Sequence, residues 1–329
     1  MQWLRGLADR RRSRQAHGLE ALHTQYGERC PKGLRIPLLL RDFSLLRAIG
    51  SGYAAIVFQA IHRPSGIECV VKIAMKARLL PEEEHRLSRE ILIHSHLLHP
   101  YILTFYAAFE DASAFYLVLE YAPSGDLYSR LRHRRRDSAP LGEAAIVHDI
   151  IAPLLNALAY MHRQNIIHRD LKPENILLMP DESIRLCDFG MSINTQRERP
   201  RSNVGTFEYM APEIMERQSD TYTTKIDIWA IGVMAFECIH GRSPFFDSTE
   251  EGIVGRIMRL DYHPREDCSA DALDFFKSTL VLDPAERMTA DELLRHPWIR
   301  QHAPDMPLYE LVRPNSAPPL LGMPMDEPS

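Results

Sequence analysis

The first third of the chain contains short apolar runs with the spacing of β-strands. Residues 43–49 alternate loosely between apolar and polar side chains, and residues 67–73 are rich in β-branched side chains. Two more apolar runs, residues 103–109 and 115–119, flank the turn-prone sequence Glu-Asp-Ala-Ser. Both patterns are typical of β-strands. We therefore expect a strand-rich region that begins near residue 42.

Helical spacing occurs once in this region and dominates the rest of the chain. Residues 81–99 predict a helix, because Pro81 suits a first turn and glutamates follow it at the positive end of the helix dipole. Residues 143–164 carry an apolar period of 3.6 residues and predict the central helix of the second region. Pro153 is expected to kink that helix or to lie on an outward turn. The basic residues 130–136 are expected to form a turn.

Composition sets limits on function. The chain has 329 residues, 45% of them hydrophobic and 25% charged, as in ordinary soluble globular proteins. The net charge of −5 gives no reason to expect nucleic-acid binding. No run of about eighteen apolar residues predicts a membrane span, and no apolar core follows the N-terminal arginines as a secretory signal requires. The five scattered cysteines (Cys30, Cys69, Cys187, Cys238 and Cys268) are interpreted as reduced thiols in a cytosolic or nuclear setting.

The two ends of the chain differ from the middle. Residues 1–41 contain the basic run Arg10–Arg14 and no sustained apolar period, so we interpret them as a flexible basic tail. The run could be a nuclear address or a docking segment, although a solvated charged stretch is the favoured interpretation. Residues 300–329 are rich in proline and predict a second flexible tail. One folded domain is expected over residues 42–299.

The strongest chemical signal is the sequence I-H-R-D-L-K-P-E-N at residues 167–175, followed by D-F-G at residues 188–190. Asp170 could accept a proton from a hydroxyl, Lys172 could hold a γ-phosphate, and Asn175 and Asp188 could supply hard oxygen ligands to Mg²⁺. Phosphoryl transfer needs this set, because it depends on positioning and charge neutralisation. The alternative for Asp170 is a loop carboxylate that caps a turn.

In this order and at this separation, the two sequences resemble the catalytic and metal loops of eukaryotic protein kinases. The resemblance implies an α+β fold of two lobes: a mostly-β N-lobe at residues 42–119, a hinge at 120–126 and a mostly helical C-lobe at 127–299. It makes His168 a structural residue that packs on Phe189. Arg287 would pair with Glu213, and Asp227 would brace the catalytic loop, as scaffold.

The resemblance also implies an ATP pocket. Residues 50–57 resemble the kinase glycine-rich loop, with Ala55 in place of its third glycine and Tyr53 one place early. Lys72 would bind the α- and β-phosphates and pair with Glu90 on the helix at 81–99. Leu119 would be the gatekeeper, backbone groups of Glu120 and Ala122 would bind adenine, and Asp126 would meet the ribose. The expected nucleotide-binding set is Ile49, Gly50, Ser51, Gly52, Val57, Val70, Lys72, Leu119, Glu120, Ala122, Asp126, Leu177 and Asp188.

The activation segment should span residues 188–213. Ser202 is the candidate for an activating phosphate that pairs with Arg169, against the alternative of an exposed serine without consequence. Thr206 together with Lys172 matches the serine/threonine pattern, so the acceptor is expected to be serine or threonine. His94 stands where many kinases carry an aliphatic side chain, and we expect it to anchor its helix less firmly.

Within the superfamily, residues 89–100, 119–123 and 296–299 resemble the Aurora kinases, whereas residues 204–213 are closer to a general kinase pattern. An Aurora-like kinase implies a role in cell division or in cilium and microtubule control, in the cytoplasm or nucleus or on the cytoskeleton. Its partners would be protein substrates with basic residues before the acceptor, and an activator that docks on the helix at 81–99. Polo-like and calmodulin-dependent-like kinases stay open as alternatives. A pseudokinase scaffold also stays open, because of the altered glycine loop and His94.

Overall fold

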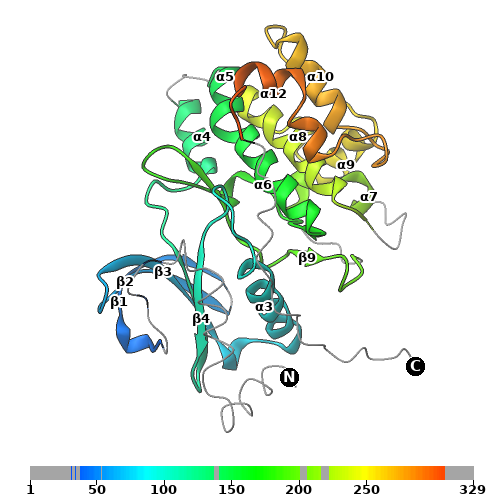
Figure 1. Cartoon of the computed structure of the whole chain (residues 1–329). Helices are drawn as coiled ribbons and strands as arrows, with labels where there is room; N and C mark the ends of the chain where they lie inside the picture. Colours follow the sequence, from blue (N-terminus) through cyan, green and yellow to red (C-terminus); the bar gives the residue numbers. More distant parts are fainter. Residues whose placement is uncertain are drawn as a thin grey trace, which may run out of the picture.

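Two lobes make up the molecule: a β-sheet with one large helix, and a helical body (Figure 1). The computed structural model describes residues 31, 34, 38–52, 54–136, 141–200, 206–215 and 222–307. The expected α+β fold of two lobes is confirmed.

The N-lobe is built on a five-stranded antiparallel sheet of order β1-β2-β3-β5-β4. The strands are β1 (Phe43–Ser51), β2 (Ala55–His62), β3 (Ile67–Met75), β4 (Phe105–Glu110) and β5 (Ala114–Glu120), with short 3-10 turns at η2 (Leu40–Asp42) and η3 (Lys76–Arg78). Successive side chains of a strand face opposite sides of a sheet. Val71 therefore packs on the outer face, while Val70 packs on the face that borders the cleft.

The outer face of the sheet is covered by residues that we assigned to the N-terminal tail. Leu34 and Leu38 are 1% and 4% exposed and belong to the same apolar cluster as Phe43 and Tyr116. An apolar sheet face must be buried against something, and these two leucines bury part of it. The packed part of the chain therefore includes residues before the expected boundary at 42.

Helix α3 (Pro81–His94) lies beside the sheet and ends five residues earlier than expected. Three groups compete for the carbonyls of its last turn. Ser95 Oγ donates to Leu92 O, His96 Nδ1 lies 2.7 Å from the same oxygen, and His96 N–H bonds to Ile93 O in a tightened turn. Such local bonds terminate helices. The apolar spacing beyond His94 concealed this stop.

The C-lobe forms around a long buried helix in three parts: α5 (Glu143–Ile146), a π-helical turn η4 (Val147–Ile151) and α6 (Ala152–Arg163). Pro153 has no N–H and its ring would clash with the carbonyl four residues back. The π-helical turn before α6 provides space for the proline ring. The kink that we expected at Pro153 is therefore a widened turn within the helix. Residues Glu143–Arg163 are long and apolar enough to cross a membrane, yet 78% of the most apolar window is buried in the protein, as in a core helix.

The remaining elements surround this helix. They are α4 (Leu127–Arg136), β6 (Ile166–Ile167) paired with β9 (Ile193–Asn194), η5 (Pro173–Asn175), β7 (Ile176–Leu178) paired with β8 (Ile184–Leu186), η6 (Phe207–Tyr209), α7 (Pro212–Met215), α8 (Lys225–His240), α9 (Glu250–Met258), α10 (Ala270–Thr279), α11 (Ala290–Leu293) and α12 (Pro297–His302). The basic residues 130–136 thus continue a helix, and the expected turn is wrong.

Two features fix the packing of the C-lobe. A Cβ at Gly232 of α8 would lie 2.5 Å from Thr279 Oγ1 of α10, so only glycine allows this close approach. At the C-terminal end, Ala303 is buried and Asn156 Nδ2 donates to Pro307 O. The first residues of the expected C-terminal tail therefore pack on the lobe.

Candidate active site

Lys72 and Glu90 form an ion pair between the sheet and α3. Lys72 Nζ lies 2.7 Å and 2.9 Å from the two carboxylate oxygens of Glu90. Lys72 lies two residues after Val70 on β3, so it faces the cleft. Burial alone would lower the pKa of Lys72, but the charges of Glu90 and Asp188 outweigh it and raise the pKa. The expected partnership is confirmed, and the lysine is held in its charged form.

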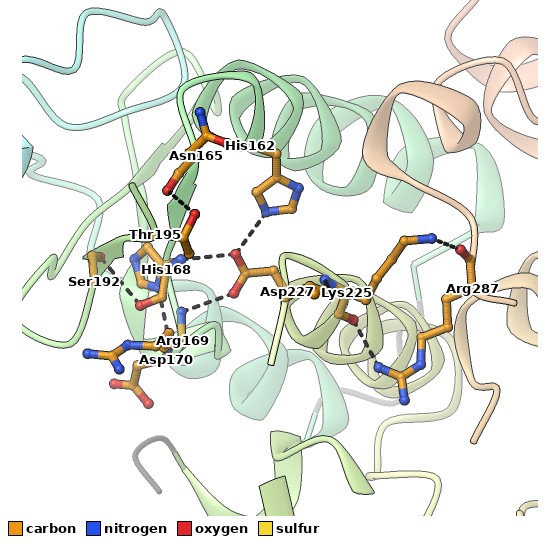
Figure 2. Close-up of polar contacts among 11 residues, drawn as sticks. His162, Asn165, His168, Arg169, Asp170, Ser192, Thr195, Lys225, Asp227 and Arg287 are labelled. Carbon is orange, nitrogen blue, oxygen red and sulfur yellow. Dashed lines mark hydrogen bonds and ion pairs between the residues drawn. The ribbon is translucent and has the colours of Figure 1, made fainter. Parts of the chain in front are cut away.

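Asp227 at the start of α8 holds the backbone of the catalytic loop, as expected (Figure 2). Its carboxylate accepts hydrogen bonds from His168 N–H at 2.9 Å and Arg169 N–H at 3.0 Å, and His162 Nε2 lies 2.9 Å away. Burial favours the neutral acid, but these partners lower the pKa of Asp227. Arg169 has φ of 70°, a conformation that L-residues rarely adopt. The buried carboxylate holds this strained turn in place.

Asp170 of the catalytic loop contacts three polar side chains: those of Lys172, Thr206 and Asn175. Lys172 Nζ lies 3.0 Å from Asp170 Oδ2, and Thr206 Oγ1 donates to Asp170 Oδ1 at 2.9 Å. Lys172 Nζ also donates to Thr206 Oγ1 at 2.8 Å, and Asn175 Nδ2 donates to Asp170 O at 2.7 Å. Burial would raise the pKa of Asp170, but Lys172 and then Thr206 outweigh it and lower the pKa. The carboxylate is therefore ionised at neutral pH.

Asp188 of the D-F-G sequence lies near Glu90. Its φ of 60° is left-handed, and a Cβ at Gly190 would lie 3.2 Å from Asp188 Oδ1 and 3.6 Å from Glu90 Oε2. These distances place the carboxylates of Asp188 and Glu90 around one glycine. Gly190 N–H also bonds to Asp188 Oδ1 at 3.3 Å. Asp188 therefore lies in the cleft that holds the Lys72–Glu90 pair.

The apolar walls of the expected nucleotide pocket come from both lobes. Val57, Val70, Leu119, Ala122 and Leu177 all belong to one apolar cluster, together with Cys187 and others. Ile49 at the end of β1 is 44% exposed. Sheet residues and the C-lobe residue Leu177 meet in this cluster, so it forms an apolar surface on which a flat base could stack.

Hydrogen bonds at the hinge restrict which backbone groups could bind a base. The N–H of Glu120 bonds to Thr104 O at 2.9 Å, so this donor is already used within the protein. Asp126 accepts from Ser129 N–H at 2.7 Å at the start of α4, so its carboxylate already stabilises that helix. Contact of Asp126 with a ribose stays a prediction. Tyr53 and Ser202 lie outside the described residues.

His168 and His94 pack against Phe189 of the D-F-G sequence. His168 lies edge-on to the Phe189 ring and its Nε2 is 3.1 Å from Cys187 O, which confirms its structural role. His94 lies 4.3 Å from the Phe189 ring centroid, and its Nε2 is 2.6 Å from Leu103 O. Burial lowers the pKa of His94 to about 4. We expected His94 to weaken the anchoring of α3, but its hydrogen bond ties the helix to the β4 side of the lobe.

Two carboxylates that we did not assign from the sequence, Glu174 and Glu237, lie near the catalytic loop. A pocket is lined by Asp170, Thr206, Tyr209, Met210 and Ile214. Tyr209 donates to Glu237, which is 8% exposed. Burial raises the pKa of Glu174, while a backbone hydrogen bond and the charge of Lys172 oppose the rise and the negative charges of Glu237 and Asp126 add to it. Two sequence features could have indicated these residues: Glu174 lies inside the catalytic loop, and Glu237 is an acid within the apolar run of α8.

The scaffold pair is also present. Arg287 donates to both oxygens of Glu213 at 2.7 Å, and its side chain is fully buried. The fold and these contacts together define a protein kinase: two lobes, a lysine–glutamate pair, a braced catalytic loop and a second carboxylate in one cleft.

Comparisons with known proteins agree. The model of the protein kinase domain family matches residues 43–299. Aurora kinase C of Mus musculus is 35% identical over 266 residues, which cover 80% of this chain and 94% of the relative. Aurora kinase of Saccharomyces cerevisiae is 37% identical over 81% of this chain and 71% of its own length, and serine/threonine-protein kinase Aurora-1 of Arabidopsis thaliana is 34% identical over 83% and 91%. The chain belongs to the protein kinase family, and within it to the Aurora-like serine/threonine kinases.

Proposed function

We propose that this kinase transfers the γ-phosphate of Mg-ATP to serine or threonine hydroxyls of proteins. The observation that carries the proposal is the ionised Asp170, which lies between Lys172 and Thr206 in the cleft that also holds the Lys72–Glu90 pair. Such an arrangement serves a reaction in which most of the catalysis comes from position and charge.

Each residue has one task in this reaction. Asp170 orients the acceptor hydroxyl and takes its proton as the new O–P bond forms and the bond between the β–γ bridging oxygen and the γ-phosphorus breaks. Lys172 neutralises charge on the transferred group, and Lys72 holds the α- and β-phosphates. Glu90 keeps Lys72 directed into the cleft, because it binds the ammonium through both oxygens.

The donors present fit a magnesium ion. Asn175 uses its amide nitrogen to bond Asp170 O, which turns the amide oxygen away and leaves it as a ligand. Asp188 adds a carboxylate, and Mg²⁺ takes few protein ligands when phosphates and water supply the others. When bound, the ion would neutralise charge on the phosphate oxygens. Among the described residues no group of three or more His, Cys, Asp or Glu side chains could hold a metal ion.

The acidic group of Glu174, Glu237 and Asp126 supports a preference for basic residues before the acceptor. Burial raises the pKa of Glu174, a backbone hydrogen bond and the charge of Lys172 oppose this rise, and Glu237 and Asp126 add to it. An arginine of a peptide would provide a positive charge and hydrogen bonds to these carboxylates. A neutral peptide side chain would not.

The biological setting is proposed from the family. An Aurora-like kinase would act in cell division or in cilium and microtubule control, in the cytoplasm or nucleus. An activator protein docked on α3 would favour the inward position of that helix, and phosphorylation of Ser202 would add charge opposite Arg169. A Ser202→Ala enzyme as active as the wild type would remove the proposal for this serine.

The reaction is tested by transfer of labelled γ-phosphate with Mg²⁺, wild type against Asp170→Asn. We expect a loss of about 10²-fold or more in kcat for the variant, the usual contribution of a positioned base. Equal transfer by both enzymes would refute the catalytic assignment. A positional-scanning peptide array tests the substrate class: wild type should select arginine before the acceptor, and Glu174→Gln should weaken that selection.

A further inference from the structure

Besides the Lys72–Glu90 pair, which joins α3 to β3, a second ion pair joins α3 to the C-lobe. Arg89 Nη1 lies 2.8 Å from Glu198 Oε2. Arg89 precedes Glu90 on α3, so adjacent residues of one helix bind β3 and the activation segment. An outward shift of α3 would break both pairs.

Glu198 is held by the backbone of the catalytic lobe. Its N–H bonds to Asn194 O at 3.0 Å, and Thr195 N–H bonds to Asn165 O at 2.9 Å. Strand β9 pairs with β6, which leads directly into the catalytic loop, and it passes close to α3 (Figure 1). The backbone of Glu198 is therefore anchored next to the segment that leads into the catalytic loop.

The charges around this pair are unbalanced without Glu198. The side chain of Arg89 is 13% exposed, and its Nε is buried with no hydrogen-bond partner among the described residues. Burial lowers the pKa of Arg169 and the positive charge of Arg89 adds to this, while Tyr222 and then the negative charge of Glu198 oppose it. Two mostly buried arginines thus lie near one carboxylate. A mostly buried cation that loses its partner is strongly destabilised.

We propose that Glu198 is a built-in counter-ion that holds α3, and with it the Lys72–Glu90 pair, in the catalytic position without a phosphate on the activation segment. Arg89 and Glu198 act as positioning residues, and the proposal rests on the kinase function above. A phosphoserine carries about −1.5 to −2 charges, and Glu198 already supplies one negative charge from within the chain. Phosphorylation of Ser202 would then raise activity that already exists.

A double-mutant cycle in a Ser202→Ala parent tests the proposal, because that parent has no phosphate acceptor at the candidate site. The parent should keep more than a tenth of the wild-type kcat/KM. We expect Glu198→Gln and Arg89→Ala each to lower kcat/KM about tenfold, equivalent to about 1.4 kcal/mol, mainly through kcat. The double variant should fall no further than the worse single variant, since the two residues act as one unit.

The matched control is Glu182→Gln, which breaks the Arg130–Glu182 pair of 2.8 Å in the C-lobe, where Arg130 is 15% exposed. It should leave kcat/KM within about twofold, because Glu182 is 67% exposed, so water screens this pair, and neither residue belongs to α3 or the activation segment. Melting temperatures of all variants separate loss of folding from loss of positioning. Hydrogen exchange of α3 amides should rise in Glu198→Gln and stay unchanged in Glu182→Gln.

Several results would overturn the proposal: a parent with less than a tenth of wild-type activity, a Glu198→Gln variant with full activity, or single losses that multiply in the double variant. Absence of phosphoryl transfer by the wild type would instead remove the proposed function. In that case the exchange of α3 amides still tests the ion pair, and unchanged protection in Glu198→Gln would contradict the positioning role.

Discussion

The buried His94 predicts a specific loss of stability in mild acid. The ring is 1% exposed and packs between Phe105 and Phe189, with Leu103 O as its hydrogen-bond partner. Its pKa falls from 6.5 to about 4, mainly because of burial; the hydrogen bond to Leu103 O and the charge of Asp188 oppose this fall, and the charges of Lys72 and His168 add to it. His94 is therefore neutral in the folded protein at pH values where an exposed histidine is protonated.

The sign of the effect follows from proton binding. Above pH 6.5 the ring is neutral in both states and its titration adds nothing to the free energy of unfolding. Between pH 6.5 and about 4 the unfolded state binds a proton that the folded state does not, so stability falls as the pH falls. For this pair of pKa values the loss is about 2 kcal/mol at about pH 5 and about 3 kcal/mol below pH 4.

Urea unfolding, followed by circular dichroism at about pH 7.5 and about pH 5, measures this loss. His94→Gln is the matched variant, since glutamine does not titrate and can donate to Leu103 O. Other groups contribute to both proteins, so the difference between them isolates His94. The wild type should lose about 2 kcal/mol more than the variant between the two pH values. Equal losses would show that the ring is not held neutral by burial.

Three further substitutions test the scaffold. Glu213→Gln leaves the fully buried Arg287 without an anion and should lower the unfolding free energy by about 3 kcal/mol. Calorimetry should show this loss as a fall of roughly 6–12 °C in Tm. An unchanged Tm would contradict the role of this pair. Asp227→Asn replaces one acceptor oxygen by a donor and should lower the free energy of unfolding by about 2 kcal/mol, measured in urea. It should also lower kcat in the phosphoryl-transfer assay. Full activity would argue against bracing of the catalytic loop. Gly232→Ala places a methyl group against Thr279 and should lower the free energy of unfolding, measured with urea, by about 1–3 kcal/mol. An unchanged free energy of unfolding would mean that α8 and α10 can separate freely.

The sequence predicts those features that depend on residue type in a fixed order. The residues of the catalytic loop and D-F-G keep their spacing whatever surrounds them, so Asp170, Lys172 and Asp188 were found directly. Four of the five strands of the N-lobe sheet were also predicted, from their apolar and β-branched runs. Strand β2 (Ala55–His62) was missed, because its first residues were interpreted as part of the glycine-rich loop.

Features that depend on contacts between distant residues could not be predicted in the same way. The end of α3 at His94 is decided by side chains that bond its last carbonyls, and apolar spacing does not report them. Leu34 looked like part of a tail because its partners lie on the sheet, far along the chain. The Arg89–Glu198 pair spans more than a hundred residues, so only the fold brings it together.

The central claim is that Lys72, Asp170, Asn175 and Asp188 serve one Mg-ATP between the lobes. A crystal structure with magnesium and a non-hydrolysable ATP analogue tests it most directly. We expect Asn175 and Asp188 oxygens at about 2.1 Å from Mg²⁺, and Lys72 on the α- and β-phosphates with its bond to Glu90 intact. A nucleotide bound outside this cleft, or a magnesium ion that Asp188 does not contact, would contradict the account.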